Sequence, residues 1–347
     1  MKNKIVWISR STGPNNNHKA YIESLKSDIY YIDWPESSSS IHRLLSWIRS
    51  AWKFRDQKKY NVIITIDIKI PIVIAKILKL IRKDQKIVCF HATELLYFLK
   101  SNYYSKLTEK FFIKSLNFYD AHICISKMGT LLLEDIIGKN KIIHTMFNGV
   151  TKRRQAIFKQ INPNLNSSNI IFISNLYAGW RLWYKGIDLM LSAFEIALKQ
   201  NPNLTLSIVG FVDNNIKDSI FDGYSDSVKE KTKLIGSVSS LEEIFLQASL
   251  CIHCSRGEAF GNSIVEAMWA GIPTIVSEYT GSKEVVELSN EDLIFPLNPP
   301  KISEKINWYF DLTLIEKQKI SNKMRASSTN YTQENAMDRL KEIVKEL

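Results

Sequence analysis

The stretch that decides the fold is residues 255–274, which read SRGEAFGNSIVEAMWAGIPT. An apolar, strand-like run ends at Cys254, and a loop with two glycines follows it. A helical pattern then begins at Asn262 or Ser263, both of which are favourable N-cap residues. The N–H groups in the first turn of a helix have no partner within the helix, and the dipole makes this end positive. The order of strand, glycine loop and helix therefore predicts an anion site suited to a diphosphate.

Five residues of this stretch have expected roles in that site. Backbone N–H groups of Phe260, Gly261 and Asn262 are expected to face the anion, together with the positive end of the helix. Two carboxylates flank them, Glu258 at the end of the strand and Glu266 about one turn into the helix. A carboxylate beside an anion site is electrostatically unfavourable. We therefore expect Glu266 to accept hydrogen bonds from ribose hydroxyls and Glu258 from sugar hydroxyls.

The same alternation of short apolar runs and helical patterns extends along the whole chain. Strands are expected at 5–9, 29–33, 62–66, 87–91, 122–126, 142–147, 169–174, 204–209, 233–235, 250–254 and 274–276. The helices expected between them include 41–57, 72–82, 104–117, 185–199, 241–247 and 263–270. Continuous apolar strands are typical of parallel sheets buried on both faces, and eleven strands are too many for one such sheet.

The domain prediction follows from length and pattern. A chain of 347 residues exceeds the size of a typical single core. The stretch 151–168 is polar, without helical or strand periodicity, and should hold the break. We expect an α/β protein with two Rossmann-like, doubly wound parallel-sheet domains facing a cleft, over residues 1–155 and 165–325. A C-terminal helix within 326–347 should pack back on the first domain.

Composition excludes several classes of protein. A hydrophobic content of 45% with 23% charged residues is that of an ordinary globular protein. The most apolar stretch, residues 62–81, contains one aspartate and three lysines, so no spanning helix is expected. The N-terminus runs from two lysines straight into a strand-like run and lacks the pattern of a signal peptide. The sequence thus predicts a cytoplasmic protein.

The pattern of cysteines and acidic residues predicts no metal and no cofactor. The four cysteines lie in apolar runs and are interpreted as buried free thiols. Cys251 and Cys254 form a C-x-x-C motif around His253, but zinc sites of this kind use a second pair, which is missing. No D-x-D motif, which could bridge a metal to a diphosphate, occurs in the chain.

The excess of positive over negative side chains lies in the first half of the chain. Residues 1–150 hold 24 Lys and Arg against 12 Asp and Glu, whereas the remainder is close to neutral. Residues 43–58 combine five basic side chains with a helical apolar face that includes Trp52. A basic amphipathic helix with tryptophans is typical of docking on an anionic membrane. The alternative is a helix that packs its apolar face on the sheet, and nucleic-acid binding lacks any motif.

The motifs resemble those of the family 4 glycosyltransferases, which have the GT-B fold and retain anomeric configuration. Glu258 and Glu266 match the Glu-x₇-Glu signature of that family. Further matches include the glycine turns that end at Gly210 and precede Val238, and Lys185 followed by glycine. Other matching segments are Phe147-Asn-Gly-Val150, the strand ends at Ser126 and His91, and residues 271–276 and 280–286. The resemblance covers roughly residues 85–290.

The resemblance implies a nucleotide-sugar donor and assigns roles to individual residues. Catalytic roles fall to Glu258, Lys185 and His91, with His91 contacting the acceptor or the sugar. Donor contacts fall to Lys185, Arg181, Asn175, Gly210, Val238, Glu258, Ala259, Phe260, Gly261, Asn262 and Glu266. The loop with Gly13 and Asn15 should face the acceptor.

Two departures from the family pattern stand out. Ser174 and Asn175 replace the usual Gly-Arg before Lys185, so Arg181 either supplies the missing guanidinium or is a solvated loop charge. Gly13 stands alone where two adjacent glycines are usual. These departures leave open a catalytically inactive subunit that binds a sugar nucleotide, and an epimerase on the same fold is a second alternative.

The expected reaction is metal-independent hexosyl transfer to a glycan or lipid-linked glycan in cell-surface polysaccharide synthesis. The charge on the leaving diphosphate would be stabilised by Lys185 and the helix N-terminus. Retention in the family is explained by front-face attack with the leaving phosphate as base. The partners expected are therefore a nucleotide-sugar, a glycan or lipid-linked acceptor and an anionic membrane surface on the cytoplasmic side, and no nucleic acid.

Overall fold

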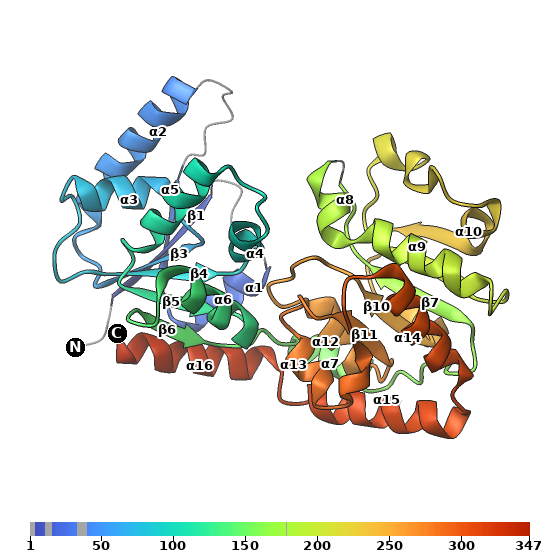
Figure 1. The fold of residues 1–347 in the computed structure, drawn as a ribbon. Coiled ribbons are helices and arrows are strands. Elements are labelled where there is room, and N and C mark those ends of the chain that lie inside the picture. The colour runs from blue at the N-terminus through green and yellow to red at the C-terminus, as the bar shows by residue number, and fades with distance from the viewer. Residues whose placement is uncertain (1–3, 11–15, 33–39, 178) are drawn as a thin grey trace. The chain divides into compact units, whose positions relative to one another are not determined.

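The computed structural model describes residues 4–10, 16–32, 40–177 and 179–347, and it divides the chain into two compact units (Figure 1). The first unit contains residues 1–148 together with the C-terminal segment 333–347. The second unit contains residues 149–332. Each unit is built on its own six-stranded sheet.

The sheet of the first unit is parallel throughout and has the order β2-β1-β3-β4-β5-β6. Strands β3, β4 and β5 are buried along nearly their whole length because they consist of β-branched and other apolar residues covered on both faces. The strands are β1 (Ile5–Arg10), β2 (Asp28–Ile32), β3 (Val62–Ile66), β4 (Lys86–His91), β5 (Ala121–Cys124) and β6 (Ile142–Thr145).

Helices connect these strands, and the last helix of the chain joins them. They are α1 (Asn16–Ser24), α2 (Ser40–Trp52) with the 3₁₀ turn Lys53–Gln57, α3 (Ile70–Ile77), α4 (Leu95–Lys100), α5 (Lys106–Leu116), α6 (Lys127–Ile137) and α16 (Gln333–Glu346). Helix α16 packs against α1, although more than 300 residues separate them in the chain (Figure 1).

The sheet of the second unit is also parallel and has the order β12-β11-β10-β7-β8-β9. This is the Rossmann order, in which the chain starts in the middle at β7, builds outward to β9, and returns through β10 on the other side. The strands are β7 (Asn169–Ile173), β8 (Thr205–Val209), β9 (Thr232–Gly236), β10 (Leu250–His253), β11 (Thr274–Ser277) and β12 (Ile294–Phe295).

Neighbours β7 and β10 form the topological switch point of this sheet, because their following helices diverge. Ligands of doubly wound sheets bind at the carboxyl ends of the strands at such a point. The helices are α7 (Lys152–Phe158), α8 (Trp180–Lys185), α9 (Ile187–Leu198), α10 (Asp226–Lys231), α11 (Glu242–Gln247), α12 (Asn262–Trp269), α13 (Lys283–Glu287), α14 (Pro299–Asp311) and α15 (Leu314–Ser328).

The structure differs from the sequence-based expectations at three places. The chain enters the second unit at Gly149, and helix α7 occupies part of the 151–168 stretch that was expected to be irregular. The helix expected at 185–199 is two helices, because Gly186 adopts a left-handed φ of 70° between α8 and α9. The two-residue strand β12 was not predicted.

The helices of the described residues do not include a membrane-spanning candidate: none combines sufficient length with sufficient apolarity. Helix α9, one of the more apolar helices, buries eight of its residues within the second unit.

Candidate functional site

The strand-to-helix turn between β10 and α12 lies at the switch point of the second unit. Gly261 is the N-cap of α12 and has a φ of 85°, a conformation in which a side chain is strained. Helix α12 begins at Asn262, as expected, but its N-cap is Gly261 instead of Asn262 or Ser263, and no side chain caps it. Because no side chain satisfies the first-turn N–H groups, this helix end remains suited to an anion.

The helix α8, which follows β7 in the chain, contributes a residue to the same turn between β10 and α12. Lys185 is the last residue of α8, and its Nζ donates a hydrogen bond to Glu258 Oε2 at 2.5 Å. Gly186 makes this approach possible: a Cβ at that position would lie 2.1 Å from the carbonyl oxygen of Cys254. The backbone after α8 thus packs directly on the end of β10. The structure therefore brings together Lys185 and Glu258, two residues that the sequence assigned to one site.

The Lys185–Glu258 pair is nearly enclosed by protein. The side chains are only 11% and 18% exposed. Burial by itself raises the pKa of the Glu258 carboxyl, but Lys185 and His253 outweigh it and hold the pKa well below its usual range. Glu258 is therefore ionised at neutral pH. It can accept hydrogen bonds from a ligand, and it cannot act as a general acid.

His253 is a member of this site that the sequence analysis missed. It is the last residue of β10, with Nε2 3.5 Å from Glu258 Oε2 and 2.9 Å from Ser255 Oγ. Burial lowers the pKa of His253, against the opposing effect of Glu258. In the sequence, His253 stood out only as the residue between the two cysteines of a weak zinc motif.

The flanking thiols are structural in character. Cys251 and Cys254 are both buried, and burial raises the pKa of Cys251 to about 12. Within the part of the chain that the structure describes, neither thiol belongs to a group of three potential metal ligands.

Glu266 lies about one turn into α12 and is nearly buried, its side chain being 6% exposed. Arg154 of α7 donates a hydrogen bond from Nη1 to Glu266 Oε1. Burial raises the pKa of Glu266, and Arg154 opposes this shift. The sequence placed Glu266 in the site but gave no sign of Arg154, which lies 112 residues earlier.

The loops that follow β7 and β8 are joined through Asn175. The Oδ1 atom of Asn175 accepts a hydrogen bond from the backbone N–H of Phe211 at 2.8 Å. Gly210 has a φ of 129°, and a Cβ there would lie 2.4 Å from the carbonyl oxygen of Ser174. Asn175 therefore fixes the geometry of these loops, in the position where the family pattern has an arginine. A contact of Asn175 or Gly210 with the donor stays a prediction.

Arg181 is not a simple solvated charge. Its guanidinium lies over the rings of Tyr177 and Trp180, 5.5 and 5.9 Å from their centroids. Its Nε donates to the carbonyl oxygen of Asn175 at 3.3 Å. Arg181 thus lies in the first turn of α8, and whether it reaches a bound diphosphate stays a prediction.

The remaining predicted donor residues lie in loops of the second unit and, for Asn262, at the start of α12. Val238 follows β9 and is 38% exposed. Ala259 and Phe260 belong to the turn between β10 and α12, where the Phe260 carbonyl accepts from Ser282 N–H at 2.9 Å. Asn262 Oδ1 is buried and has no hydrogen-bond partner among the described residues. Their donor contacts also stay predictions.

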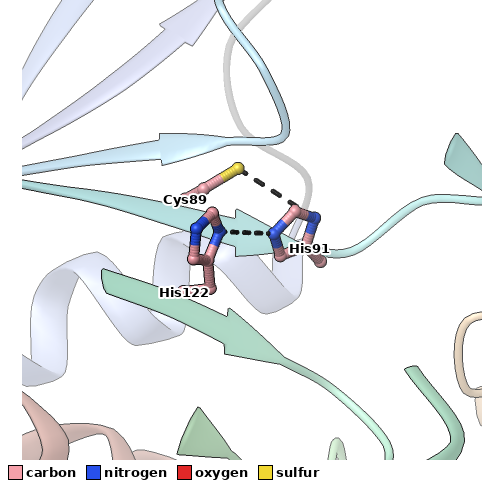
Figure 2. A group of neighbouring side chains, drawn as sticks. All are labelled: Cys89, His91 and His122. Atoms are coloured by element: carbon pink, nitrogen blue, oxygen red, sulfur yellow. Dashed lines mark hydrogen bonds between the residues drawn. The ribbon is translucent and has the colours of Figure 1, made fainter. Parts of the chain in front are cut away.

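In the first unit, His91 is part of a buried chain of polar side chains (Figure 2). His91 ends β4, and its Nε2 lies 3.0 Å from His122 Nδ1 on β5. Its Nδ1 lies 4.0 Å from Cys89 Sγ. Parallel pairing of Cys89 with His122 places all three side chains on one face of the sheet. The sequence singled out His91 but did not predict these partners.

Among the described residues, Cys89, His91 and His122 form a group that could hold a metal ion, because their ligand atoms lie within 4.8 Å of one another. Burial lowers the pKa of His91 and lowers that of His122 to about 4, so both rings are neutral at neutral pH. The two nitrogens of His91 face different partners. The arrangement is therefore a hydrogen-bonded chain through His91 and not a set of lone pairs directed at one point. Gly13 and Asn15 of the predicted acceptor-side loop lie outside the described residues.

Two Rossmann-like units, one with a strand–loop–helix anion site at its switch point, define the GT-B class of architecture. Solved structures of this class cover almost all of the chain. Anabaena HepE, solved with UDP, has a TM-score of 0.73 at 16% identity and covers 99% of this chain and 100% of its own. Sucrose-phosphate synthase from Thermosynechococcus elongatus has a TM-score of 0.75 at 14% identity, with 99% and 98% covered. These likenesses show the GT-B fold.

The family follows from residues 154–329, which match the family model for glycosyl transferases group 1. The match covers half of the chain, and the protein belongs to this family. Among curated relatives, an uncharacterized glycosyltransferase of Methanocaldococcus jannaschii is 30% identical over 46% of this chain and 45% of its own length. The phosphatidylinositol N-acetylglucosaminyltransferase gpi3 subunit of Schizosaccharomyces pombe is 28% identical over 34% of this chain and 25% of its own. The matches thus span less than half the length of these relatives.

Proposed function

We propose that the protein is a retaining glycosyltransferase that moves a hexose from a nucleotide-sugar, in the first instance a uridine diphosphate sugar, to an acceptor. The observation that carries the proposal is the Lys185–Glu258 pair at the switch point of a Rossmann sheet, beside the uncapped start of α12. Membership of the group 1 family supports glycosyl transfer. The choice of uridine is taken from HepE, which was solved with UDP, UDP and glucose, and UDP-glucose.

In this proposal the diphosphate binds at the start of α12. Its negative charge grows as the bond to the anomeric carbon breaks, and the first-turn N–H groups and Lys185 stabilise that charge in the transition state. Glu258, being ionised, accepts hydrogen bonds from hydroxyls of the transferred sugar and orients it. Donor charge is then met by protein groups, and the reaction requires no metal.

Retention follows if the acceptor attacks from the face that the diphosphate leaves, with the leaving phosphate removing the proton of the acceptor. We keep His91 as the residue that contacts the acceptor or the sugar. Because its pKa is lowered by burial, the ring is neutral and offers one donor and one acceptor nitrogen. Nε2 of His91 faces His122, so Nδ1, whose neighbour Cys89 Sγ lies 4.0 Å away, is the nitrogen left for that contact.

The acceptor is proposed to be a glycan or lipid-linked glycan of cell-surface polysaccharide synthesis, used at the cytoplasmic face of a membrane. Helix α2 supports this choice. Its N-terminal half leaves Ile41, Leu44 and Leu45 exposed, at 71%, 50% and 49%, whereas Ser50 and Ala51 near its end are buried. The apolar face is therefore packed only at the C-terminal end of α2. Exposed leucines beside Arg43 and Arg49 fit an anionic membrane surface. One relative, the gpi3 subunit, is named for a lipid acceptor.

The test combines binding and turnover. A panel of nucleotide-sugars is screened by thermal shift, because a donor that binds only the native state raises its melting temperature. The donor that stabilises the protein is then incubated with and without polyprenyl-linked glycan acceptors. Acceptor-dependent release of the nucleoside diphosphate supports the proposal, with the configuration of the product read by NMR. Interconversion of free nucleotide-sugars would indicate an epimerase, and binding without turnover an inactive subunit.

A further inference from the structure

Glu266 is a nearly buried carboxylate with an incomplete set of partners. Among the described residues, Arg154 is the partner of Glu266 and donates a hydrogen bond to one oxygen, Oε1. The other oxygen, Oε2, accepts no hydrogen bond from them. Among the described residues, Oε2 is not one of the buried polar atoms that lack a partner, so it is reached by solvent and is accessible to a ligand. The free oxygen therefore points to a ligand that donates hydrogen bonds.

A second unpaired acceptor lies on the same face of α12. Asn262 precedes Glu266 by four residues, and residues four apart are neighbours on a helix. The Oδ1 atom of Asn262 is buried without a partner. Two neighbouring acceptors, one of them charged, are complementary to a ligand with two adjacent hydroxyl groups, such as the ribose of a nucleotide.

Arg154 holds a defined place beside Glu266, because α7 is fastened to α12. At the start of α7, the Thr151 side chain accepts from the backbone N–H of Arg154 at 3.4 Å. At the other end, Arg325 of α15 donates to the carbonyl of Lys159 at 3.3 Å and to that of Ala270 at 2.8 Å. These two carbonyls follow the last turns of α7 and α12, so one guanidinium joins both helix ends.

Half of the Arg154 side chain is exposed, at 52%, while Glu266 is covered. The arginine can therefore contribute charge and geometry to Glu266 without forming part of the core. We propose that Arg154 is a positioning residue: it binds Oε1 of Glu266 and turns Oε2 toward the ribose hydroxyls of the donor. This inference rests on the proposed function and adds to it a residue of α7.

The first experiment measures UDP binding to the whole protein by titration calorimetry, for the parent and for Arg154→Met. Binding of UDP is compared with binding of its 2′,3′-dideoxy analogue. We expect the parent to bind UDP about tenfold or more tightly than the analogue. Arg154→Met should lose most of that preference by weakening UDP binding, with binding of the analogue almost unchanged. Arg153→Met removes the same charge from an exposed neighbour on α7 and should bind like the parent.

A second measurement separates positioning from a general structural role. Without Arg154, burial of Glu266 is no longer opposed, so its carboxyl takes up a proton at higher pH. The ratio of the UDP affinities of parent and Arg154→Met should therefore increase as pH falls from 8.5 to 6.5. Titration of the ligand itself cancels in this ratio. Arg154→Lys, which keeps the charge, should restore part of the preference for UDP.

The outcomes distinguish two failures. If Arg154→Met loses UDP and the dideoxy analogue by the same factor, or binds both like the parent at every pH, the positioning role is wrong while the proposed function stands. If the parent binds no nucleoside diphosphate, the proposed function is wrong and the inference falls with it.

Discussion

Replacing Lys185 by methionine tests whether the Lys185–Glu258 pair is the electrostatic centre of the second unit. Methionine has a similar length and no charge, so the change leaves Glu258 without its closest cation. The two side chains are 11% and 18% exposed, and water can therefore replace the lost partner only in part. His253, 3.5 Å from the same oxygen, also remains but is held neutral by burial.

The expected cost is large for a single substitution. Removal of one member of a buried pair destabilises a protein by roughly 3–5 kcal/mol, and the partial exposure of Glu258 reduces this to about 2–4 kcal/mol. For a unit of this size, 1 kcal/mol corresponds to about 2–4 °C in melting temperature. We therefore expect the transition of the second unit in Lys185→Met to fall by about 5–15 °C at pH 8.

The dependence on pH has a definite sign. In the parent, the folded-state pKa of Glu258 lies below the unfolded value, so the pair stabilises the fold at neutral pH and this contribution is lost as pH falls below about 4. In Lys185→Met, burial dominates and raises the folded-state pKa above the unfolded value. The variant should then gain stability, relative to the parent, as pH falls from 8 to 5.

The assay is differential scanning calorimetry of four proteins: the parent, Lys185→Met, Glu258→Gln and the double variant. If the pair is coupled as described, the double variant should recover much of the stability that Lys185→Met loses, because no unpaired charge remains. Strict additivity of the two single changes, or a loss that is the same at pH 5 and pH 8, would refute the reasoning.

Three further predictions follow from the proposed function. Turnover should survive EDTA, because Lys185 and helix N–H groups meet the charge of the diphosphate; a complete loss that magnesium restores would contradict this. Glu266→Ala should weaken binding of the donor by roughly 1–3 kcal/mol in calorimetry, and unchanged affinity in a folded variant would remove its ribose role. The protein should sediment appreciably with anionic vesicles at low salt, and less as salt rises. Replacing four basic residues of α2 and the turns after it by glutamine should abolish most of this sedimentation and leave donor binding intact. These residues are Arg49, Lys53, Arg55 and Lys58. A parent protein that stays in the supernatant at low salt would argue against membrane docking and for a soluble acceptor.

The fold was predictable from the sequence because each strand is marked by a pattern in consecutive residues. Each buried strand is a short apolar run, and the parallel sheets cover those runs on both faces. Eleven of the strands lie within a few residues of their expected positions. Strand β12 has only two residues, Ile294 and Phe295, which is too short to give a pattern. Helix α7 was missed because its sequence, KRRQAIF, has four polar residues in a row and only one buried side chain.

The site was predictable where one continuous segment forms it. Glu258, Gly261 and Glu266 lie on the same strand–loop–helix unit, so their spacing alone places them together. The cap of α12 was assigned to the wrong residue because the choice depends on the backbone at Gly261, whose left-handed φ lets the helix start without a capping side chain. Sequence patterns reflect the preferences of side chains. Gly261 suits this position because it has no side chain, which allows the left-handed φ.

The partners of the site residues were not predictable, because they come from distant segments. Arg154 reaches Glu266 across 112 residues, and His122 reaches His91 through the register of two strands. His253 could have been found: strand residues alternate sides, and a histidine two positions before Ser255, at the end of the strand that leads to Glu258, belongs to the same edge of the sheet. The C-x-x-C spacing drew the interpretation toward zinc instead.

These partners change what the site residues can do. Lys185 and Glu258 together carry no net charge, so an approaching diphosphate meets a neutral pair and not a free lysine. The same holds for Arg154 and Glu266. The positive potential of the site must then come mainly from the start of α12, until the ligand itself competes for the lysine. We expect Lys185 to exchange its bond with Glu258 for one with the diphosphate, which frees Glu258 to accept a sugar hydroxyl. A nucleoside diphosphate without sugar would take Lys185 away from Glu258, whose side chain is only 18% exposed, and would offer no hydroxyl in its place. An intact nucleotide-sugar should therefore bind more tightly than the diphosphate alone, and by a smaller margin in Glu258→Gln.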